Sequence, residues 1–428
     1  MGTMRIVEVR PDVLGSKRIV LATIGSLGDL HPMLALALEL KRRGHRVTVA
    51  STAYYRKKVE GLGIMFCPLR PNWDPTDREL IAQCEDLKSG PEVLFRRLIL
   101  PHLRETYDDL VAAVKGADLM IAGELVYAAP LVAEKLGLPW VSVILSPTSF
   151  FSAHDPSLLV NVPAAYRLRR FGWLVNRSIL EMGKVATRHW WEPIRQLRRE
   201  EGLRPARNPV LKDKFSPYLV LALFSRRLAR RQRDWPRRAF QPGFVYFDRG
   251  EEAVCQELAD FLAAGDAPLV FTLGSTAVHN AGDFYDIAIV AARQLKRRAV
   301  LLGQKSEPLV GWAEVLTLPY APYSQIFPHA AAIVHQGGSG TTGHALWAGR
   351  PQLIVPYGWD QPDNGARVKR LGAGLCMARA AYSVQSAVAE LGRLLVEPQF
   401  AARAAEVGAQ IRREDALKGA CDAIESVL

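Results

Sequence analysis

Residues 334–364 read VHQGGSGTTGHALWAGRPQLIVPYGWDQPDN, and this stretch decides the fold class of the 428-residue chain. The apolar run from Ala330 to Val334 predicts a buried strand, and a glycine-rich loop follows it. Thr342 to Ala348 then has a helical pattern that ends at a glycine. A second apolar run, Gln352 to Val355, leads into the polar cluster 360–364. Strand, glycine loop, helix and strand in this order predict half of a nucleotide-binding α/β domain.

The glycine loop has the chemistry of an anion site. Glycines let the backbone approach a ligand closely, and the first N–H groups of the following helix have no partner inside it. Ser339, Thr341 and Thr342 add hydroxyl donors, and His335 adds a ring N–H. An ordinary N-capped turn is the alternative. Because no Lys follows the glycines, the loop is not a P-loop.

Together, HQGGSGTT and GRPQLIVPYGWDQPDN resemble the donor-binding motif of GT-B glycosyltransferases of the family 1/28 type. These enzymes move sugars from nucleotide diphosphates to small acceptors. The resemblance implies an α/β fold of two Rossmann-like, doubly wound domains that face a cleft, with the last helix crossing back to the N-terminal domain. It also implies a donor site in which Asp360 and Gln361 hold the sugar. The residues implied to hold the diphosphate are His335, Gly337, Gly338, Ser339, Gly340, Thr341 and Thr342.

The length allows two domains of roughly 150–200 residues each. We predict an acceptor-binding domain over residues 1–240 and a nucleotide-sugar-binding domain over 241–405, with the crossing helix over 406–428. The first domain opens with a strand at Arg18–Ile24 and a helix at Met33–Arg43. In the second, a strand at Pro268–Leu273 precedes Gly274, Ser275 and Thr276, which are further candidate donor-binding residues.

The loop between the first strand and helix contains the predicted catalytic group. Gly28-Asp29-Leu30-His31-Pro32 resembles the family's G-[HD]-x-x-P loop, whose second position is the catalytic base, and this implies that Asp29 is the base and Gly28 part of the donor site. A carboxylate needs burial to raise its pKa for this task. Asp29 as a helix N-cap is the structural alternative, and His31 is the competing base. Asp-x-Asp is missing, as in metal-independent, inverting GT-B enzymes, so no metal and no cofactor are expected.

The donor and acceptor follow from narrower features. No Glu stands near Gly343-His344, where plant-type members use one to hold the ribose hydroxyls, and this favours a dTDP-sugar over a UDP-sugar. Residues 18–425 also resemble the bacterial rhamnosyltransferases that build rhamnolipids, through segments such as Gln232-Arg-Asp-Trp-Pro236. That resemblance implies dTDP-rhamnose and an apolar, hydroxylated, lipid-like acceptor. The candidate acceptor-binding residues are His31, Phe150, Phe151, His154 and Trp173, with core packing as the alternative for each aromatic.

Alternatives to this function remain open. A UDP-sugar-dependent glucosyltransferase acting on phenolic, sterol or polyketide molecules is the nearest one. The others are a nucleotide-sugar epimerase on the same fold, a homologue without turnover, and a basic membrane- or nucleic-acid-binding module. Loss of His335 or Asp29 would mark the homologue without turnover. Both residues are present.

Composition sets outer limits. A hydrophobic content of 49% and a charged content of 23% are those of a globular protein. Five scattered cysteines indicate neither a disulfide framework nor a zinc site, and they favour a cytoplasmic location. The net charge of +12 is concentrated in Arg-rich runs at 166–170, 195–199 and 226–238. These runs predict either a solvated surface or peripheral contact with an anionic inner membrane; no nucleic-acid-binding module is recognisable.

Overall fold

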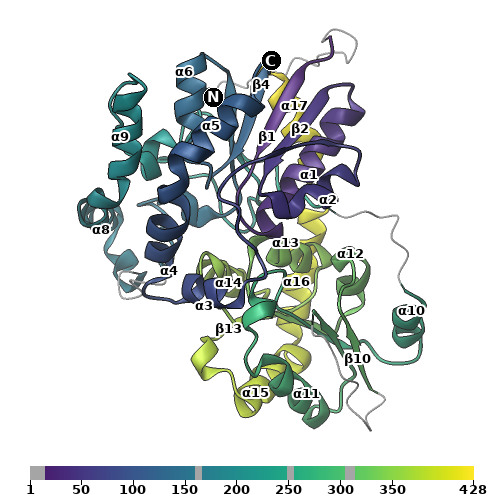
Figure 1. The fold of residues 1–428 in the computed structure, drawn as a ribbon. Helices are drawn as coiled ribbons and strands as arrows, with labels where there is room; N and C mark the ends of the chain where they lie inside the picture. Colours follow the sequence, from purple (N-terminus) through teal and green to yellow (C-terminus); the bar gives the residue numbers. More distant parts are fainter. Residues whose placement is uncertain (1–14, 160–165, 248–254, 304–313) are drawn as a thin grey trace, which may run out of the picture.

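The computed structural model describes residues 15–159, 166–247, 255–303 and 314–428. These residues form two α/β lobes, one above the other in Figure 1, and each lobe is built on its own parallel sheet. The doubly wound GT-B fold implied by the sequence is confirmed. Residues 1–14 at the start of the chain and residues 248–254, close to the predicted boundary between the domains, lie outside the described residues.

The N-terminal lobe contains a seven-stranded sheet in the order β3-β2-β1-β4-β5-β6-β7. Parallel strands buried on both faces are near-continuous apolar runs, and the sequences RIVLA and WVSVI in β1 and β5 follow that rule. The strands are β1 Arg18–Ala22, β2 Arg46–Ser51, β3 Met65–Pro68, β4 Leu119–Gly123, β5 Trp140–Ile144, β6 Leu219–Ala222 and β7 Ala239–Phe240. The helices of this part of the chain are α1 Leu27–Arg42, α2 Arg56–Glu60, α3 Arg78–Glu85, α4 Gly90–Glu92, α5 Leu103–Ala113, α6 Ala129–Leu136, α8 Trp173–Ala186 and α9 Glu192–Glu200.

The C-terminal lobe contains a six-stranded sheet in the order β10-β9-β8-β11-β12-β13. Its strands are β8 Leu269–Thr272, β9 Ala299–Leu302, β10 Val315–Leu318, β11 Ala332–His335, β12 Gln352–Ile354 and β13 Gly374–Cys376. Its helices are α10 Gln256–Ala263, α11 Phe284–Gln294, α12 Tyr323–Ile326, α13 Ser339–Ala348, α14 Gln361–Leu371, α15 Val384–Val396 and α16 Pro398–Ile411. Of the helices within the described residues, none is long and apolar enough to span a membrane.

Three helices near the predicted site begin elsewhere than the sequence pattern indicates. α1 starts at Leu27, six residues before the predicted start at Met33, because Ser26 and Asp29 form a capping box there. α13 starts at Ser339, three residues before the predicted Thr342. The polar cluster 360–364, for which the sequence pattern predicts no helix, supplies the N-cap and the first turn of α14.

The end of the chain contacts both lobes. In place of the single helix predicted over 406–428, α16 packs on α13 in the C-terminal lobe, and a separate helix, α17 (Ala416–Glu425), packs on α1 in the N-terminal lobe. Figure 1 shows this crossing in yellow. Ala420, Cys421 and Ile424 of α17 are buried in the same core as Ile19.

Candidate active site

Asp29 lies directly after the carboxyl end of β1, in the first turn of α1. Its Oδ2 accepts hydrogen bonds from the backbone N–H of Ser26 (2.8 Å) and from the Ser26 hydroxyl (3.1 Å). Burial raises the pKa of Asp29 to about 7, and the nearby charges of Glu124 and Asp360 raise it further, against the Ser26 hydrogen bonds, which lower it. Because Asp360 belongs to the other lobe, the electrostatic environment of Asp29 includes a carboxyl group of the C-terminal lobe.

The backbone around Asp29 is shaped to receive its carboxylate. Gly25 has a φ of 137°, and a Cβ placed on it would lie 2.2 Å from Asp29 Oδ2. Only glycine fits here without displacing that oxygen. Gly28, predicted to be a donor-site residue, is exposed in the same turn, and its N–H donates to Ser26 Oγ.

His31 differs from Asp29 in its surroundings. Its ring packs against Phe247, with 4.9 Å between centroids. Burial, together with the charges of Lys58 and His344, lowers the pKa of His31 to about 3. The ring is therefore neutral near pH 7. Since His344 belongs to the other lobe, the electrostatic environment of His31 includes groups from both lobes.

His335 ends β11 and is fully buried. Its Nδ1 accepts a hydrogen bond from the Gly337 N–H (3.0 Å), and its Nε2 lies 3.0 Å from Gln352 Oε1. Burial lowers the pKa of His335 to about 4, so the ring is neutral, with Nε2 carrying the proton. Both ring nitrogens are thus used inside the protein, and in this arrangement His335 orients the glycine loop instead of offering a donor to a ligand.

The glycine loop turns the chain sharply between β11 and α13. Gly337 has a φ of 94°, and a Cβ there would clash with Ile354. Gly274, which follows β8, has a φ of 67°. A Cβ on this residue would lie 2.3 Å from Nε2 of Gln336, so a side chain there would collide with the Gln336 amide. By contrast, a Cβ on Gly340 meets no atom within 4 Å. The first turn of α13 therefore opens onto free space, with its N–H groups pointing from the helix end.

The remaining predicted donor-site residues surround this helix end. Asp360 Oδ2 accepts hydrogen bonds from Ser339 Oγ (2.7 Å) and Asn364 Nδ2 (2.8 Å), and burial raises its pKa. The side-chain oxygen of Gln361 accepts hydrogen bonds from the backbone N–H groups of Tyr357 (2.7 Å) and Gly358 (3.1 Å). These bonds stabilise the turn that precedes α14.

The hydroxyls of the loop are used unequally. The Thr341 hydroxyl bonds to Tyr323, which also lies 3.0 Å from Thr272 Oγ1. Thr342 is fully buried, and its hydroxyl has no hydrogen-bond partner among the described residues. Ser275 and Thr276 continue from Gly274 at the carboxyl end of β8, next to β11 in the sheet.

The predicted acceptor residues do not form one group. Phe150 is buried between Phe215 and Trp235, stacked on each, and so belongs to the core, which is the alternative weighed for this residue. Phe151 is half-buried, with Lys214 Nζ 5.5 Å from its ring. His154 and Trp173 are exposed and stack on each other at the surface, with 5.8 Å between ring centroids.

Glu124 and Lys214 form an ion pair near Asp29 that sequence patterns do not indicate. Glu124 follows β4, the neighbour of β1, and its Oε2 lies 3.3 Å from Lys214 Nζ. Lys214 is buried, and this burial lowers its pKa, whereas the Glu124 charge raises it. The pair is separated by 90 residues, so no sequence spacing could have linked its members.

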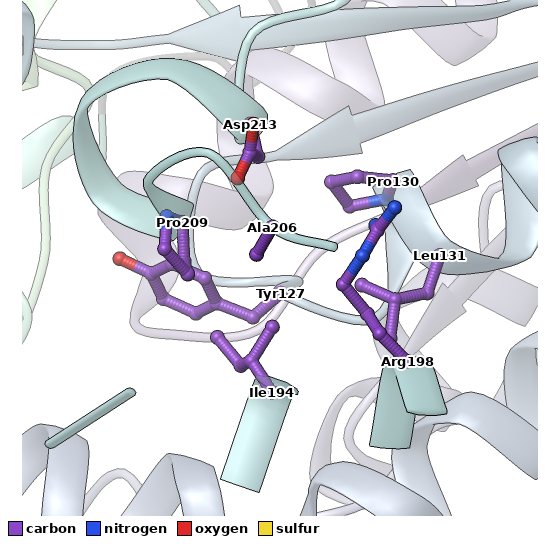
Figure 2. Close-up of a pocket in the computed structure, with 8 residues that line it drawn as sticks. All are labelled: Tyr127, Pro130, Leu131, Ile194, Arg198, Ala206, Pro209 and Asp213. Carbon is purple, nitrogen blue, oxygen red and sulfur yellow. The ribbon is translucent and has the colours of Figure 1, made fainter. Parts of the chain in front are cut away.

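The small cavity in Figure 2 is not a substrate site. Its volume is about 10 Å³, room for at most one water molecule. It lies in the N-terminal lobe, away from Asp29, and is lined by Tyr127, Pro130, Leu131, Ile194, Arg198, Ala206, Pro209 and Asp213. Among the residues that the structure describes, no cluster of three or more His, Cys, Asp or Glu side chains could hold a metal ion.

Comparison with known proteins identifies the class. A family model described as "Glycosyltransferase family 28 N-terminal domain" matches residues 19–150, and one described as "Erythromycin biosynthesis protein CIII-like, C-terminal domain" matches residues 305–418. The chain is 32% identical over 429 residues to O-mycaminosyltylonolide 6-deoxyallosyltransferase of Streptomyces fradiae, covering 95% of this chain and 97% of that protein. The chain therefore belongs to the GT-B glycosyltransferases of the family 1/28 type and is an enzyme that uses nucleotide-sugar donors.

Two further relatives are more distant. The sterol 3-beta-glucosyltransferase of Arabidopsis thaliana is 30% identical over 384 residues, which span 83% of this chain and 57% of the plant protein. The crystal structure of glycosyltransferase VinC in complex with dTDP has the same fold, with a TM-score of 0.69 at 21% identity over 96% of this chain and 99% of that chain. The narrower resemblance to rhamnolipid-building rhamnosyltransferases stays a prediction.

Proposed function

We propose that this chain is an inverting, metal-independent glycosyltransferase that moves a 6-deoxyhexose, of which rhamnose is one example, from a dTDP-sugar to a hydroxyl of an apolar acceptor. The observation that carries the proposal is the position of Asp29. Burial raises the pKa of its carboxyl group to about 7, and the charge of Asp360 in the other lobe also raises it. Asp360 in turn accepts a hydrogen bond from Ser339, the first residue of α13. These links support a base in one lobe that acts on a donor held at the start of α13 in the other.

In the proposed reaction, Asp29 accepts the proton of the acceptor hydroxyl as the acceptor oxygen forms a bond to the anomeric carbon. The bond from that carbon to the diphosphate oxygen breaks at the same time, and its electron pair leaves with the diphosphate. Attack from the face opposite the leaving group inverts the anomeric centre. The N–H groups at the start of α13 stabilise the charge that develops on the diphosphate.

The residues around the helix end have separate proposed roles. His335, through its bond to the Gly337 N–H, fixes the loop that receives the diphosphate. Asp360 is proposed to bind a sugar hydroxyl, helped by the Gln361 amide nitrogen. The raised pKa of Asp360 and its hydrogen bonds from Ser339 and Asn364 support a carboxyl group held ready at this point.

The preference for dTDP rests on Gly343 and on two relatives. A Cβ on Gly343 would lie 2.8 Å from the Phe244 ring. A glutamate that binds the ribose hydroxyls would therefore not fit at position 343. The S. fradiae relative is named for transfer of a 6-deoxyallosyl group, and VinC was crystallised with dTDP. UDP-glucose is the second candidate donor, with a sterol-like acceptor, because of the similarity to the plant sterol glucosyltransferase.

A thermal-shift panel with dTDP, UDP and GDP tests the donor. A ligand that binds only the folded state raises the melting temperature by mass action. We expect dTDP to raise it more than UDP does, and GDP to have little effect. A larger shift with UDP would favour the sterol-type alternative, and no shift with any nucleotide would contradict the donor site. Assays of the preferred dTDP-sugar with hydroxylated lipids, sterols and polyketides then test the acceptor.

A further inference from the structure

An apolar stripe lies exposed on α8 and on the turn before it, η5 (Leu168–Phe171). Phe171, Trp173 and Leu174 are 59%, 45% and 63% exposed, and Met182 and Val185 are 63% and 74% exposed. On a helix, positions 174, 182 and 185 fall on one side. Asn176 is the only buried residue of α8, so this helix contributes almost nothing to the core. Figure 1 shows α8 at the outer edge of the N-terminal lobe.

Basic side chains flank this stripe. Arg167, Arg170, Arg177 and Arg188 are all exposed. Glu181, the one acidic residue of α8, falls on the same side of the helix as Leu174 and Val185, and Lys184 pairs with it at 2.6 Å. Arg170 lies over the Phe171 ring, 5.0 Å from its centroid, so charge and apolar surface are joined in the same turn. An exposed apolar stripe with Trp and Phe at one end and a basic border is the pattern of a helix that lies in the surface of an anionic membrane.

A pocket lined by arginines lies next to loop 153–155, and this loop also contacts α8. The loop 153–155 contacts α8 through the hydrogen bond from Asn176 Nδ2 to Ala153 O (3.0 Å) and the stacking of His154 on Trp173. On its other side, Asp155 lines an open pocket of about 260 Å³. Four guanidinium groups and this one carboxylate line that pocket; the guanidinium groups belong to Arg227, Arg230, Arg367 and Arg370.

We propose that α8 and this arginine pocket form a membrane-docking surface for bilayers that contain anionic phospholipids. The stripe at Phe171, Leu174, Met182 and Val185 enters the boundary between headgroups and acyl chains, and Arg227 and Arg230 bind headgroup phosphates. Asp155 pairs with Arg367 and Arg370, and Glu406 and Glu414 lie near Arg227, so these carboxylates reduce the positive potential of the pocket. This surface binds membranes whether or not the chain transfers a sugar, so its test is independent of the proposed function.

Co-sedimentation with lipid vesicles tests the proposal on the full chain. We expect the protein to partition at least roughly tenfold more strongly onto vesicles of phosphatidylcholine mixed with phosphatidylglycerol than onto phosphatidylcholine alone, because each basic group near an anionic surface contributes several-fold. Added salt should weaken the binding. Equal partition onto both vesicles, or none, overturns the proposal.

Two pairs of variants locate the surface. The double variant Leu174→Ser/Val185→Ser should lose most of the binding, whereas Val396→Ser, which changes an equally exposed apolar residue of the other lobe, should keep it. Arg227→Gln/Arg230→Gln should lose roughly tenfold or more, and Arg293→Gln/Arg297→Gln, which removes the same charge from the surface of the C-terminal lobe, should lose much less. Apart from the half-buried Arg297, these side chains are exposed, so melting temperature and dTDP binding should not change.

Light scattering on the same proteins separates a membrane from a second copy of the chain. The proposal expects the wild type and Leu174→Ser/Val185→Ser to have the same mass in solution. The opposite result is a dimeric wild type, a monomeric Leu174→Ser/Val185→Ser variant, and no vesicle binding by either protein. That result would show that the stripe is an interface between copies and would overturn membrane docking.

Discussion

Ser26 and Asp29 are joined by two hydrogen bonds that end on a single oxygen. Asp29 Oδ2 accepts both the backbone N–H of Ser26, at 2.8 Å, and its hydroxyl, at 3.1 Å. Within the described residues both bonds to this carboxyl group go to Oδ2, which leaves Oδ1 for an acceptor. Ser26, and not Asp29, is the N-cap of α1, so the N-cap alternative for Asp29 is wrong. Asp29 completes the capping box as the third helical residue, and this position is compatible with its proposed role as the base.

Replacement of Asp29, the proposed base, should reduce catalysis without weakening nucleotide binding. Asp29→Asn keeps an oxygen that can accept the Ser26 bonds but removes the site for the proton. We expect transfer to fall roughly 10²–10⁴-fold, the usual contribution of a general base, with dTDP affinity nearly unchanged. Asp286→Asn, in the exposed first turn of α11, is the matched control and should keep full activity. Wild-type turnover in Asp29→Asn would contradict the assignment of Asp29.

The pH profile should show the same group. Because burial raises the pKa of Asp29 to about 7, kcat/KM should fall as the pH drops below about 7, where the carboxylate becomes protonated. His31 and His335, whose pKa values are lowered to about 3 and about 4, stay neutral through this range and produce no such limb. A plateau that extends down to pH 5 would contradict this assignment.

The raised pKa of Asp29 should make the stability of the folded chain fall with increasing pH, whereas kcat/KM should rise. The folded pKa of Asp29 lies above its ordinary value of 3.8, so folding favours the protonated form. Its contribution to stability is complete below about pH 4 and is lost as the pH rises through about 7. Asn cannot ionise, so the melting temperature of Asp29→Asn relative to wild type should be higher at pH 8 than at pH 5. An equal difference at both pH values would show that Asp29 is not buried as described.

Local sequence was enough to predict the elements that hold this site. Apolar runs predicted the ends of β1, β8, β11 and β12 to within two residues, because parallel strands are buried on both faces. Starts of helices were predicted less well: α1 and α14 begin inside segments that look like polar loops. In each case polar side chains near the helix start form hydrogen bonds that stabilise the first turn, and the sequence shows these residues without their geometry.

Contacts between distant residues could not be predicted at all. The sequence indicated His335 as a phosphate ligand, but its bond to Gln352 depends on the pairing of β11 with β12. Glu124 and Lys214 meet only because β4 and the segment before β6 converge near β5. Phe150 was a fair acceptor candidate from its neighbourhood in the chain, yet stacking on Trp235 places it in the core.

Gly340 offers a way to fill the donor site without disturbing the fold. Its Cβ position is open, and it lies in the first turn of α13. Because Ala is favoured over Gly in helices by up to about 1 kcal/mol, Gly340→Ala should keep or raise the melting temperature while weakening dTDP binding. Gly183→Ala, at another open helical glycine on α8, is the control and should leave dTDP binding unchanged. Full dTDP affinity in Gly340→Ala would mean that the diphosphate lies elsewhere.

Arg367 joins the two lobes through a buried network. It is 1% exposed, bonds to Asp363 Oδ2 at 2.7 Å, and also bonds to Asp155 of the N-terminal lobe. Asp363 in turn accepts hydrogen bonds from the Thr148 hydroxyl (3.1 Å) and the Leu158 N–H (2.9 Å), both in the N-terminal lobe. The relative position of the lobes, and hence of Asp29 and α13, therefore depends on this arginine.

Loss of that arginine should be severe because it leaves carboxylates buried without their partner. We expect Arg367→Met to lower the free energy of unfolding by about 3–5 kcal/mol, measured by urea denaturation. Arg370→Met removes the more exposed partner of Asp155 (3.2 Å) and should cost less than about 1 kcal/mol. Adding Asp363→Asn to Arg367→Met should restore part of the loss, since one buried charge is then neutral. Equal costs for the two single variants would show that Arg367 is solvated and does not hold the lobes together.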